Sequence, residues 1–235
     1  MNHLINKIES YPFDKLRRLL SSVNPNKKNN ELINLSIGEP KKRASKKVLS
    51  ILASNKELFS QYPPLGSMNI LVSAYKSYLS KRFNIKEVAN DNILNLGGTR
   101  EGTFSVIQSL FNKKIKSKKP YVIMPNPFYQ IYGGATLLAG GISKQINLNE
   151  DNGFSLDLNS INENIWKKCQ IFVACSPSNP TGSVLKEDEI RKIIKLSRKY
   201  GFYIVSDECY IDIYRESKPK SFIEISYKQL SLIHI

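Results

Sequence analysis

A carboxylate and a phenol follow a β-branched apolar run in the stretch Ile204-Val205-Ser206-Asp207-Glu208-Cys209-Tyr210. Such a run is typical of a buried strand, whose polar residues emerge at its carboxyl end. In open α/β sheets, ligands bind beyond the carboxyl ends of the strands. Asp207 and Tyr210 are therefore candidate ligand-binding residues, although Asp207 taken alone would favour a strand-end cap or a salt bridge.

A second polar segment, Ser176-Pro177-Ser178-Asn179-Pro180-Thr181-Gly182, follows a predicted strand at 170–175. Proline fixes its own backbone and restricts the residue before it, so the amide of Asn179 is held in a rigid, extended segment. That rigidity suits a side chain that forms a hydrogen bond with a ligand. By itself, Asn-Pro-Thr-Gly is also compatible with an ordinary turn.

A glycine-containing turn, Gly97-Gly98-Thr99-Arg100-Glu101-Gly102, connects a predicted strand at 92–96 to a predicted helix at 103–112. A helix that begins in this way presents unpaired backbone N–H groups at the positive end of its dipole, where phosphate binds. The spacing matches neither the dinucleotide-binding nor the Walker motif, so a dinucleotide or a nucleoside triphosphate is less favoured. Glycines that serve only close strand-to-helix packing are the alternative.

In chain order, these segments resemble the signature of fold-type I, class I/II aminotransferases, which use pyridoxal 5′-phosphate (PLP), and the resemblance covers residues 10–215. It implies that Asp207 pairs with the protonated pyridine nitrogen, a contact worth about 4 kcal/mol at an effective dielectric near 20. Asn179 and Tyr210 would share the phenolate oxygen of PLP, and Tyr129 would stack on its ring. The phosphate would be held by Gly98, Thr99 and Arg100.

The same resemblance assigns roles to two residues nearer the N-terminus. Gly38-Glu39-Pro40 resembles the arm that crosses the mouth of the active site, which makes Gly38 a candidate substrate-binding residue; a simple turn is the alternative. Tyr62 would reach the PLP phosphate of a neighbouring subunit, which implies a homodimer. A core aromatic before a turn explains Tyr62 about equally well.

The stretch Pro125-Asn126-Pro127-Phe128-Tyr129-Gln130-Ile131-Tyr132, followed by Leu137-Leu138-Ala139-Gly140, narrows the resemblance to the succinyldiaminopimelate aminotransferase branch. That branch implies an amino-acid and a 2-oxo-acid substrate, with amino transfer between N-succinyl-diaminopimelate and 2-oxoglutarate in lysine and diaminopimelate biosynthesis. Another class I/II aminotransferase, a β-lyase of the same fold and a non-catalytic PLP-binding fragment are the alternatives.

The resemblance also calls for a lysine that forms a Schiff base with PLP, in a Ser-x-x-Lys context one strand beyond Asp207. Lys218, Lys220 and Lys228 lack that context, so no catalytic residue is assigned. We therefore expect a C-terminally truncated chain without the small C-terminal domain. Reading the coding DNA beyond the codon of Gln229 would test that expectation.

The order of the elements predicts an α/β fold, and the resemblance implies the three-layer large domain of PLP-dependent transferases, with a mainly parallel, incomplete sheet. Further strands are expected at 32–37, 120–124, 143–147 and 202–207, and helices at 67–83, 128–140 and 186–200. Residues 1–50 are expected to form the N-terminal arm and part of the small domain, and residues 51–235 the incomplete PLP-binding domain.

Composition excludes several other classes of protein. Lysine and arginine outnumber the acidic residues by 35 to 20, but they are scattered along the chain, so we expect no nucleic-acid partner. The 2 histidines and 3 cysteines show no metal-ligand or disulfide spacing, so no metal is expected. No apolar run approaches the roughly 18 residues that span a bilayer, and no signal core is present, which predicts a cytoplasmic protein without membrane contact.

Overall fold

A computed structural model describes residues 3–8, 10–23, 38, 42–62, 69–113 and 121–227. The chain divides into two compact units, one formed by Met1–Ile8 with Asn69–Ile235 and the other by Glu9–Met68. The larger unit contains the sheet, and the smaller unit contains helices only among its described residues. The predicted division at residue 50 concerns the domains of the family and stays a prediction.

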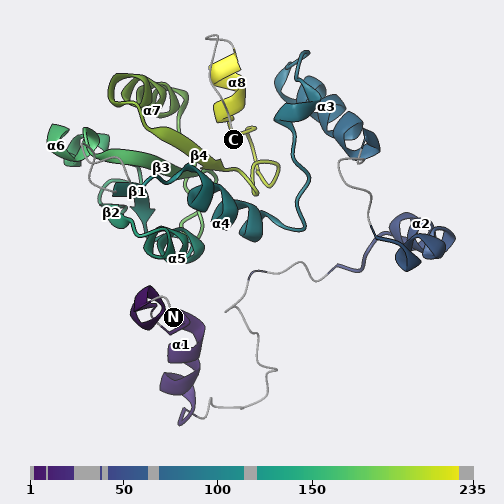
Figure 1. Cartoon of the computed structure of the whole chain (residues 1–235), viewed down its shortest axis with the longest axis horizontal. Helices are drawn as coiled ribbons and strands as arrows, with labels where there is room; N and C mark the ends of the chain where they lie inside the picture. The colour runs from purple at the N-terminus through teal and green to yellow at the C-terminus, as the bar shows by residue number, and fades with distance from the viewer. Residues whose placement is uncertain are drawn as a thin grey trace. The chain divides into compact units, whose positions relative to one another are not determined.

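The larger unit is built on four parallel strands in the order β2-β1-β3-β4 (Figure 1). Parallel strands require crossover connections, and here helices supply most of them. The predicted α/β fold with a parallel sheet is therefore confirmed. The strands are β1 (Tyr121–Asn126), β2 (Ile142–Asn147), β3 (Cys169–Cys175) and β4 (Tyr203–Asp207).

Every residue of β3 is buried, as expected for a central parallel strand that is covered on both faces. Its side chains alternate between two hydrophobic clusters, one on each face of the sheet. Phe172 belongs to the first cluster, whereas Ile171 and Val173 belong to the second. The sheet thus forms the middle layer of the predicted three-layer arrangement.

On one face lie α4 (Thr99–Leu110) and α5 (Ile131–Leu138), which contact each other and bury the second cluster. On the inward side of α4, Ile107 and the following Phe111 are buried, with Phe104 and Leu110 packed against their cluster. The helix begins at Thr99, four residues earlier than predicted, so its N-terminus lies within the glycine turn.

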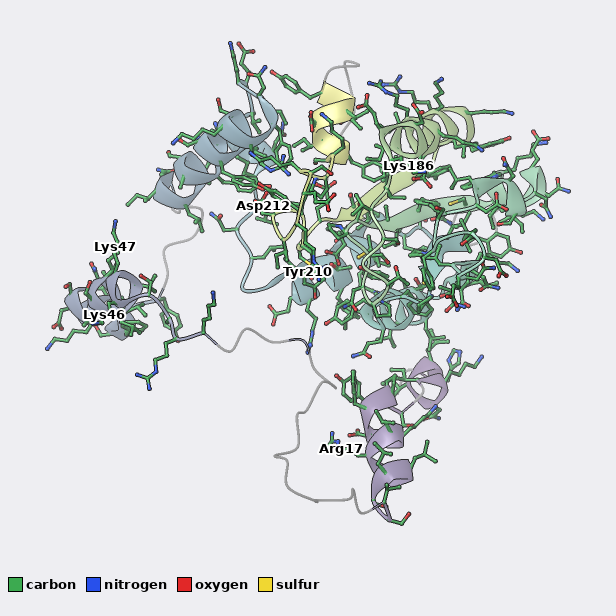
Figure 2. The ribbon with its side chains drawn as sticks, turned by 180° about the vertical axis from the view of Figure 1, so that it is seen from behind. Arg17, Lys46, Lys47, Lys186, Tyr210 and Asp212 are labelled. Carbon is green, nitrogen blue, oxygen red and sulfur yellow. The ribbon has the colours of Figure 1, made fainter. Side chains whose placement is uncertain are left out.

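A third cluster joins α3 (Asn69–Phe83) to the segment that follows β4. Leu79 and Phe83 are the buried residues of α3, and Ile211 packs with them. The same segment carries Tyr210 and Asp212, both labelled in Figure 2. The helix predicted at 67–83 is confirmed over its described residues.

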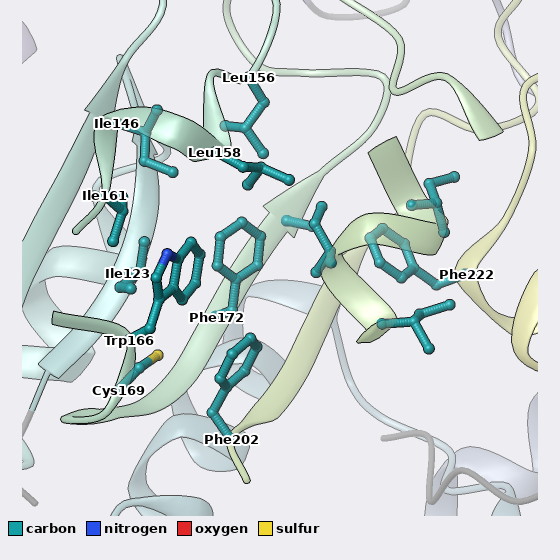
Figure 3. Close-up of a cluster of buried hydrophobic side chains, with 14 of the residues drawn as sticks. Ile123, Ile146, Leu156, Leu158, Ile161, Trp166, Cys169, Phe172, Phe202 and Phe222 are labelled. Atoms are coloured by element: carbon teal, nitrogen blue, oxygen red, sulfur yellow. The ribbon is translucent and has the colours of Figure 1, made fainter. Parts of the chain in front are cut away.

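On the other face lie α6 (Glu163–Trp166), α7 (Glu187–Tyr200) and α8 (Phe222–Tyr227), which bury the first cluster (Figure 3). Trp166 stacks against Phe172 and Phe202 at ring-centroid distances of 6.0 and 5.6 Å. Such aromatic contacts contribute beyond the area they bury. Because Trp166 is the single tryptophan of the chain, its fluorescence reports the integrity of this core.

Helix α7 forms where its sequence predicts it, because both ends match the helix dipole. Acidic residues occupy its first turn and basic residues its last, and the Glu189 carboxylate accepts a 2.7 Å hydrogen bond from the backbone N–H of Lys186. Gly201 ends the helix in the left-handed conformation, with φ of 65°. Its inward residues Ile190, Ile193 and Ile194 are all fully buried.

One predicted strand of the larger unit is wrong. The structure forms a 3₁₀ turn at Asn90–Asn92, and residues 93–96 are extended without pairing to any strand of the described residues. Leu94 and Leu96 are 81% and 51% exposed, so the short apolar run has no layer to pack against here. A strand needs a neighbour for its backbone hydrogen bonds, and apolar alternation alone does not supply one. The strand predicted at 32–37 lies outside the described residues.

The smaller unit contains α1 (Pro12–Leu20), α2 (Lys46–Ser54) and the 3₁₀ turn Lys56–Ser60, none of which buries a residue. Two further 3₁₀ turns, His3–Lys7 and Leu158–Ser160, belong to the larger unit. Among the described helices of both units, none combines the length and apolar character required to cross a bilayer.

Candidate functional site

The candidate site lies at the carboxyl edge of the sheet, where β3 and β4 end side by side. Cys175 and Asp207 are paired across the two strands as their last residues. The backbone N–H of Ser176 donates a 3.1 Å hydrogen bond to the carbonyl oxygen of Asp207, which joins the two polar segments recognised in the sequence. This is the edge at which α/β sheets bind ligands.

The carboxylate of Asp207 accepts hydrogen bonds on both oxygens. The hydroxyl of Tyr132 donates to Oδ2 at 2.6 Å, and the backbone N–H of Cys209 donates to Oδ1 at 3.3 Å. Tyr132 is fully buried, and burial, followed by the neighbouring Cys175 and Asp207, raises its pKa far above the ordinary value. The phenol therefore remains protonated and keeps donating to Asp207.

Tyr132 is a functional candidate to which the sequence motifs assign no role, although it belongs to the stretch from Pro125 to Tyr132 that resembles the aminotransferase family. It lies three residues after Tyr129, a spacing that brings two side chains of a helical turn together. The two rings meet edge to face, with centroids 5.9 Å apart and an interplanar angle of 87°. The i, i+3 spacing of these two tyrosines at the start of a predicted helix is the sequence feature that indicates their contact.

Arg100 and Tyr129, which are predicted to bind different parts of one cofactor, are in direct contact. The Nε–H group of Arg100 donates a 2.7 Å hydrogen bond to the Tyr129 hydroxyl, and the guanidinium carbon lies 6.0 Å from the ring centroid. Arg100 belongs to the first turn of α4, whose N-cap is Gly98. Gly98 has no side chain to cap the helix, so the backbone N–H groups of this end are suited to an anion.

Tyr210 follows β4 and is 39% exposed. Burial is the main cause that raises the pKa of its phenol, and Cys209, Asp207, Cys175 and Tyr129 add to the effect. Tyr210 therefore shares the electrostatic environment of Asp207 and Tyr129, and its hydroxyl is a neutral hydrogen-bond donor near neutral pH.

The segment that carries Asn179 is folded back by its own backbone. The N–H groups of Ser178 and Gly182 donate 2.8 Å hydrogen bonds to the carbonyl oxygens of Ser183 and Ser178, and Gly182 adopts φ of 72°, which favours glycine. The thiol of Cys175, at the end of β3, donates a 3.5 Å hydrogen bond to the carbonyl oxygen of Pro177, two residues before Asn179. Asn179 therefore lies at the same edge of the sheet as Asp207.

The remaining predicted residues fall into two groups. Thr99 lies beside Arg100 at the start of α4, where its carbonyl oxygen accepts a 2.8 Å hydrogen bond from Thr103. Gly38 and Tyr62 belong to the smaller unit, in which Tyr62 is 97% exposed. Their predicted contacts with substrate and cofactor stay predictions.

The cysteines of this region do not have the properties of nucleophiles. Burial raises the pKa of the Cys175 thiol, and burial together with Asp207 raises the pKa of Cys209 to about 12. Nucleophilic cysteines need a lowered pKa. In the described part of the chain, no three His, Cys, Asp or Glu side chains are grouped as a metal site. The polar cluster is thus one carboxylate surrounded by phenols, with an arginine at a helix N-terminus nearby.

Residues 30–232 match the family model described as aminotransferase class I and II. The chain belongs to this family. An LL-diaminopimelate aminotransferase from Natranaerobius thermophilus is 27% identical over 95% of the chain, and a probable aspartate aminotransferase from Methanocaldococcus jannaschii is 31% identical over 80%. The crystal structure of an aminotransferase from Neisseria meningitidis superposes with a TM-score of 0.88 at 36% identity, covering 97% of this chain and 58% of that one.

The chain spans about half the length of the curated relatives, namely 57% of the first and 48% of the second. The family depends on PLP, which carries a phosphate, a phenolate oxygen and a basic ring nitrogen. The donor set at the sheet edge fits these groups one by one: Asp207 for a protonated nitrogen, Tyr210 for the phenolate, and Arg100 with the α4 N-terminus for the phosphate. Tyr129, which offers an aromatic ring for stacking, contacts Arg100 through its hydroxyl and Tyr132 through its ring.

Proposed function

We propose that the sheet edge around Asp207 binds PLP, and that the chain is the cofactor-binding part of an aminotransferase. The observation that carries the proposal is the carboxylate of Asp207, held at the end of β4 by the buried hydroxyl of Tyr132 at 2.6 Å. A carboxylate so oriented, next to aromatic rings and a basic helix N-terminus, complements a planar cationic ring that bears a phosphate.

Within this proposal, PLP supplies an electron sink for the carbanion that forms at the substrate α-carbon. Asp207 keeps a proton on the ring nitrogen by pairing with it, which the sink requires. The phenol of Tyr210 and the amide of Asn179 donate hydrogen bonds to the phenolate oxygen. The ring of Tyr129 covers one face of the planar ligand at little cost in entropy.

The phosphate of PLP is assigned to Gly98, Thr99 and Arg100. The first turn of α4 presents backbone N–H groups at the positive end of the helix dipole, and Arg100 adds a full positive charge. Arg100 is held toward Tyr129 by its 2.7 Å hydrogen bond. One side chain thus connects the phosphate end of the site to its stacking face.

We further propose an amino donor of the diaminopimelate type, N-succinyl-diaminopimelate, with 2-oxoglutarate as acceptor. The support is the sequence from Pro125 to Gly140, which resembles the succinyldiaminopimelate branch, together with a relative that carries the name LL-diaminopimelate aminotransferase. The relative named as a probable aspartate aminotransferase makes aspartate the second candidate donor.

We propose a homodimer in which Tyr62 of one subunit reaches the phosphate bound by the other. Tyr62 is exposed in its own unit, as a residue that contacts a partner must be before assembly. The expected result is a dimer in sedimentation experiments and weaker PLP binding by Tyr62→Phe. A monomer that binds PLP as tightly as a dimer would contradict this assignment.

Titration of the 235-residue chain with PLP tests the cofactor proposal. Binding is followed by PLP absorbance and by quenching of Trp166 fluorescence, with pyridoxal and inorganic phosphate as competitors. Saturable binding at one site per chain supports the proposal, and linear, non-saturating changes overturn it. Borohydride reduction of the complex then separates two cases: covalent trapping on one lysine indicates a catalyst, and reversible binding alone indicates a non-catalytic binding fragment.

The substrate proposal is tested by glutamate formation from 2-oxoglutarate, with the 235-residue chain and any longer product of the same reading frame. N-succinyl-LL-diaminopimelate is expected to be the preferred donor over LL-diaminopimelate and aspartate. A preference for either of the other two donors would overturn the substrate proposal and leave the cofactor proposal standing.

A further inference from the structure

Glu208, directly after Asp207, is a half-buried carboxylate that takes no part in the site described above. Its Oε1 accepts hydrogen bonds from the Ser206 hydroxyl and from the backbone N–H of Phe222, both at 2.8 Å. Its Oε2 accepts a 2.6 Å hydrogen bond from the hydroxyl of Ser221. Because Phe222 is the first residue of α8, this one side chain ties the end of β4 to the start of that helix and closes the loop between them.

The middle of the same loop is held by α3. Ile211 is buried and packs in the third cluster with Leu79. The carboxylate of Asp212 accepts hydrogen bonds from the Nε–H group of Arg82 at 2.8 Å and from the Tyr78 hydroxyl at 2.7 Å. The loop therefore has a fixed start, middle and end, and Tyr210 lies between the first two attachments.

The backbone around Tyr210 is continuous with these attachments. The N–H of Ile211 donates a 2.9 Å hydrogen bond to the carbonyl oxygen of Glu208, so the residues from 208 to 211 form one turn. Within that turn Tyr210 stands three residues after Asp207, and its carbonyl oxygen accepts a 2.9 Å hydrogen bond from the backbone N–H of Ile213. The backbone of Tyr210 is therefore attached on both sides, through the side chain of Glu208 before it and the buried Ile211 after it.

We propose that Glu208 is a positioning residue, which holds the loop so that the phenol of Tyr210 faces the ligand site beside Asp207. The inference rests on the proposed PLP site and adds a residue to it that touches no ligand. Glu208 acts only through Tyr210, and this separates its role from a general contribution to stability. Burial raises the pKa of Glu208, while its hydrogen bonds and Arg82 oppose that rise, which agrees with a carboxylate used as an internal acceptor.

A double-mutant cycle of PLP affinity tests the proposal, with Glu208→Gln, Tyr210→Phe and the double variant. The amide of glutamine keeps the shape of the side chain but offers one acceptor oxygen where the carboxylate offers two. Each single change is expected to weaken PLP binding about tenfold, the size of one lost hydrogen bond. The double variant is expected to bind about as weakly as either single variant, because both changes remove the same contact.

Glu216→Gln is the matched control, since Glu216 is an exposed carboxylate of the same loop. Its PLP affinity should equal that of the unchanged chain. Trp166 fluorescence and the urea midpoint verify that each variant is folded. If Glu208→Gln does not fold, Ser221→Ala removes a single hydroxyl donor and is expected to weaken binding about threefold, again without further loss in combination with Tyr210→Phe.

The outcomes separate this inference from the proposed function. If the unchanged chain does not bind PLP, the proposed function fails. If it binds PLP but the two single effects multiply in the double variant, the positioning role of Glu208 is wrong and the PLP site stands. The inference is equally overturned if Glu208→Gln, or Tyr210→Phe, leaves PLP affinity unchanged in a folded protein.

Discussion

The hydroxyl of Tyr132 donates a 2.6 Å hydrogen bond to Oδ2 of Asp207, across the boundary between α5 and the end of β4. The donor is fully buried and the acceptor partly exposed, so Oδ2 of the carboxylate is fixed by the protein while Oδ1 accepts only the longer, 3.3 Å hydrogen bond from the N–H of Cys209 among those described. Buried polar groups need partners, and here the partner of the phenol is the proposed ligand-binding carboxylate. The orientation of Asp207, at the end of a strand, thus depends on Tyr132 in the helical layer that covers that face of the sheet.

Tyr132→Phe should weaken PLP binding about tenfold while leaving the fold intact, since it removes one hydrogen bond to a charged group and keeps the ring. Titration of the variant with PLP measures the effect. Tyr203→Phe is the matched control, because Tyr203 lies at the opposite end of β4 and is 47% exposed. Unchanged affinity in folded Tyr132→Phe would show that Asp207 does not need this hydrogen bond.

Arg100→Gln should weaken binding of PLP about tenfold but leave binding of pyridoxal, which has no phosphate, unchanged, because a charge-assisted contact to phosphate is lost. Affinities for both ligands at two salt concentrations provide the measurement. Arg191→Gln on α7 is the control, since Arg191 pairs with Glu187 in the layer opposite α4. Equal losses for PLP and pyridoxal would place Arg100 away from the phosphate.

Phe172→Ala should lower the free energy of unfolding by about 3–5 kcal/mol, because it leaves a cavity in a close-packed aromatic cluster. Phe172 is fully buried and stacks on Trp166, so urea unfolding followed by tryptophan fluorescence measures the change directly. Phe154→Ala changes a residue that is 36% exposed, so it should lower the free energy of unfolding by well under half as much. Similar losses of unfolding free energy in the two variants would contradict the assignment of this core.

The ion pair of Arg82 with Asp212 predicts a specific acid dependence of stability. Hydrogen bonds from Arg82 and then Tyr78 lower the pKa of Asp212 below its ordinary value of 3.8. A lowered pKa contributes stability above the unfolded pKa, and that contribution is lost as the pH falls through the folded pKa. The contribution is under about 1 kcal/mol, since Asp212 is largely solvent-accessible.

Asp212→Asn should therefore reduce the loss of stability below about pH 4 and leave the slope near pH 7 unchanged. Urea midpoints across this range, compared with the exposed carboxylate variant Asp91→Asn, provide the measurement. If Asp212→Asn steepens the acid loss, the direction of the pKa shift is wrong.

The central strands and the helix at 187–200 could be predicted because local and tertiary requirements agree there. Apart from Gln170, whose amide exchanges hydrogen bonds with the backbone of Asn112, the residues of β3 are apolar, and α7 carries its charges and its terminating Gly201 in the order that a helix requires. The prediction of a strand at 92–96 was wrong because it rested only on the local alternation of apolar residues. Leu94 and Leu96 alternate correctly, yet no described strand lies beside them.

The candidate site was predicted residue by residue only where a sequence motif marked the position. Asp207, Tyr210 and Arg100 stand in recognisable segments, and the structure brings them to one edge of the sheet region. Tyr132 and Glu208 act through contacts with residues far along the chain, Asp207 and Phe222 respectively. Such partners are set by the packing of layers, which spacing in the sequence does not reveal.

The most direct test of the account is the PLP affinity of Asp207→Asn, which keeps the shape of the side chain and removes its charge. Because Asp207 is partly exposed, the expected loss is at least about tenfold, less than the full value of a buried contact pair. Asp188→Asn, on the exposed side of α7, should bind PLP like the unchanged chain. A folded Asp207→Asn protein that binds PLP with undiminished affinity would contradict the central claim that this carboxylate holds the cofactor.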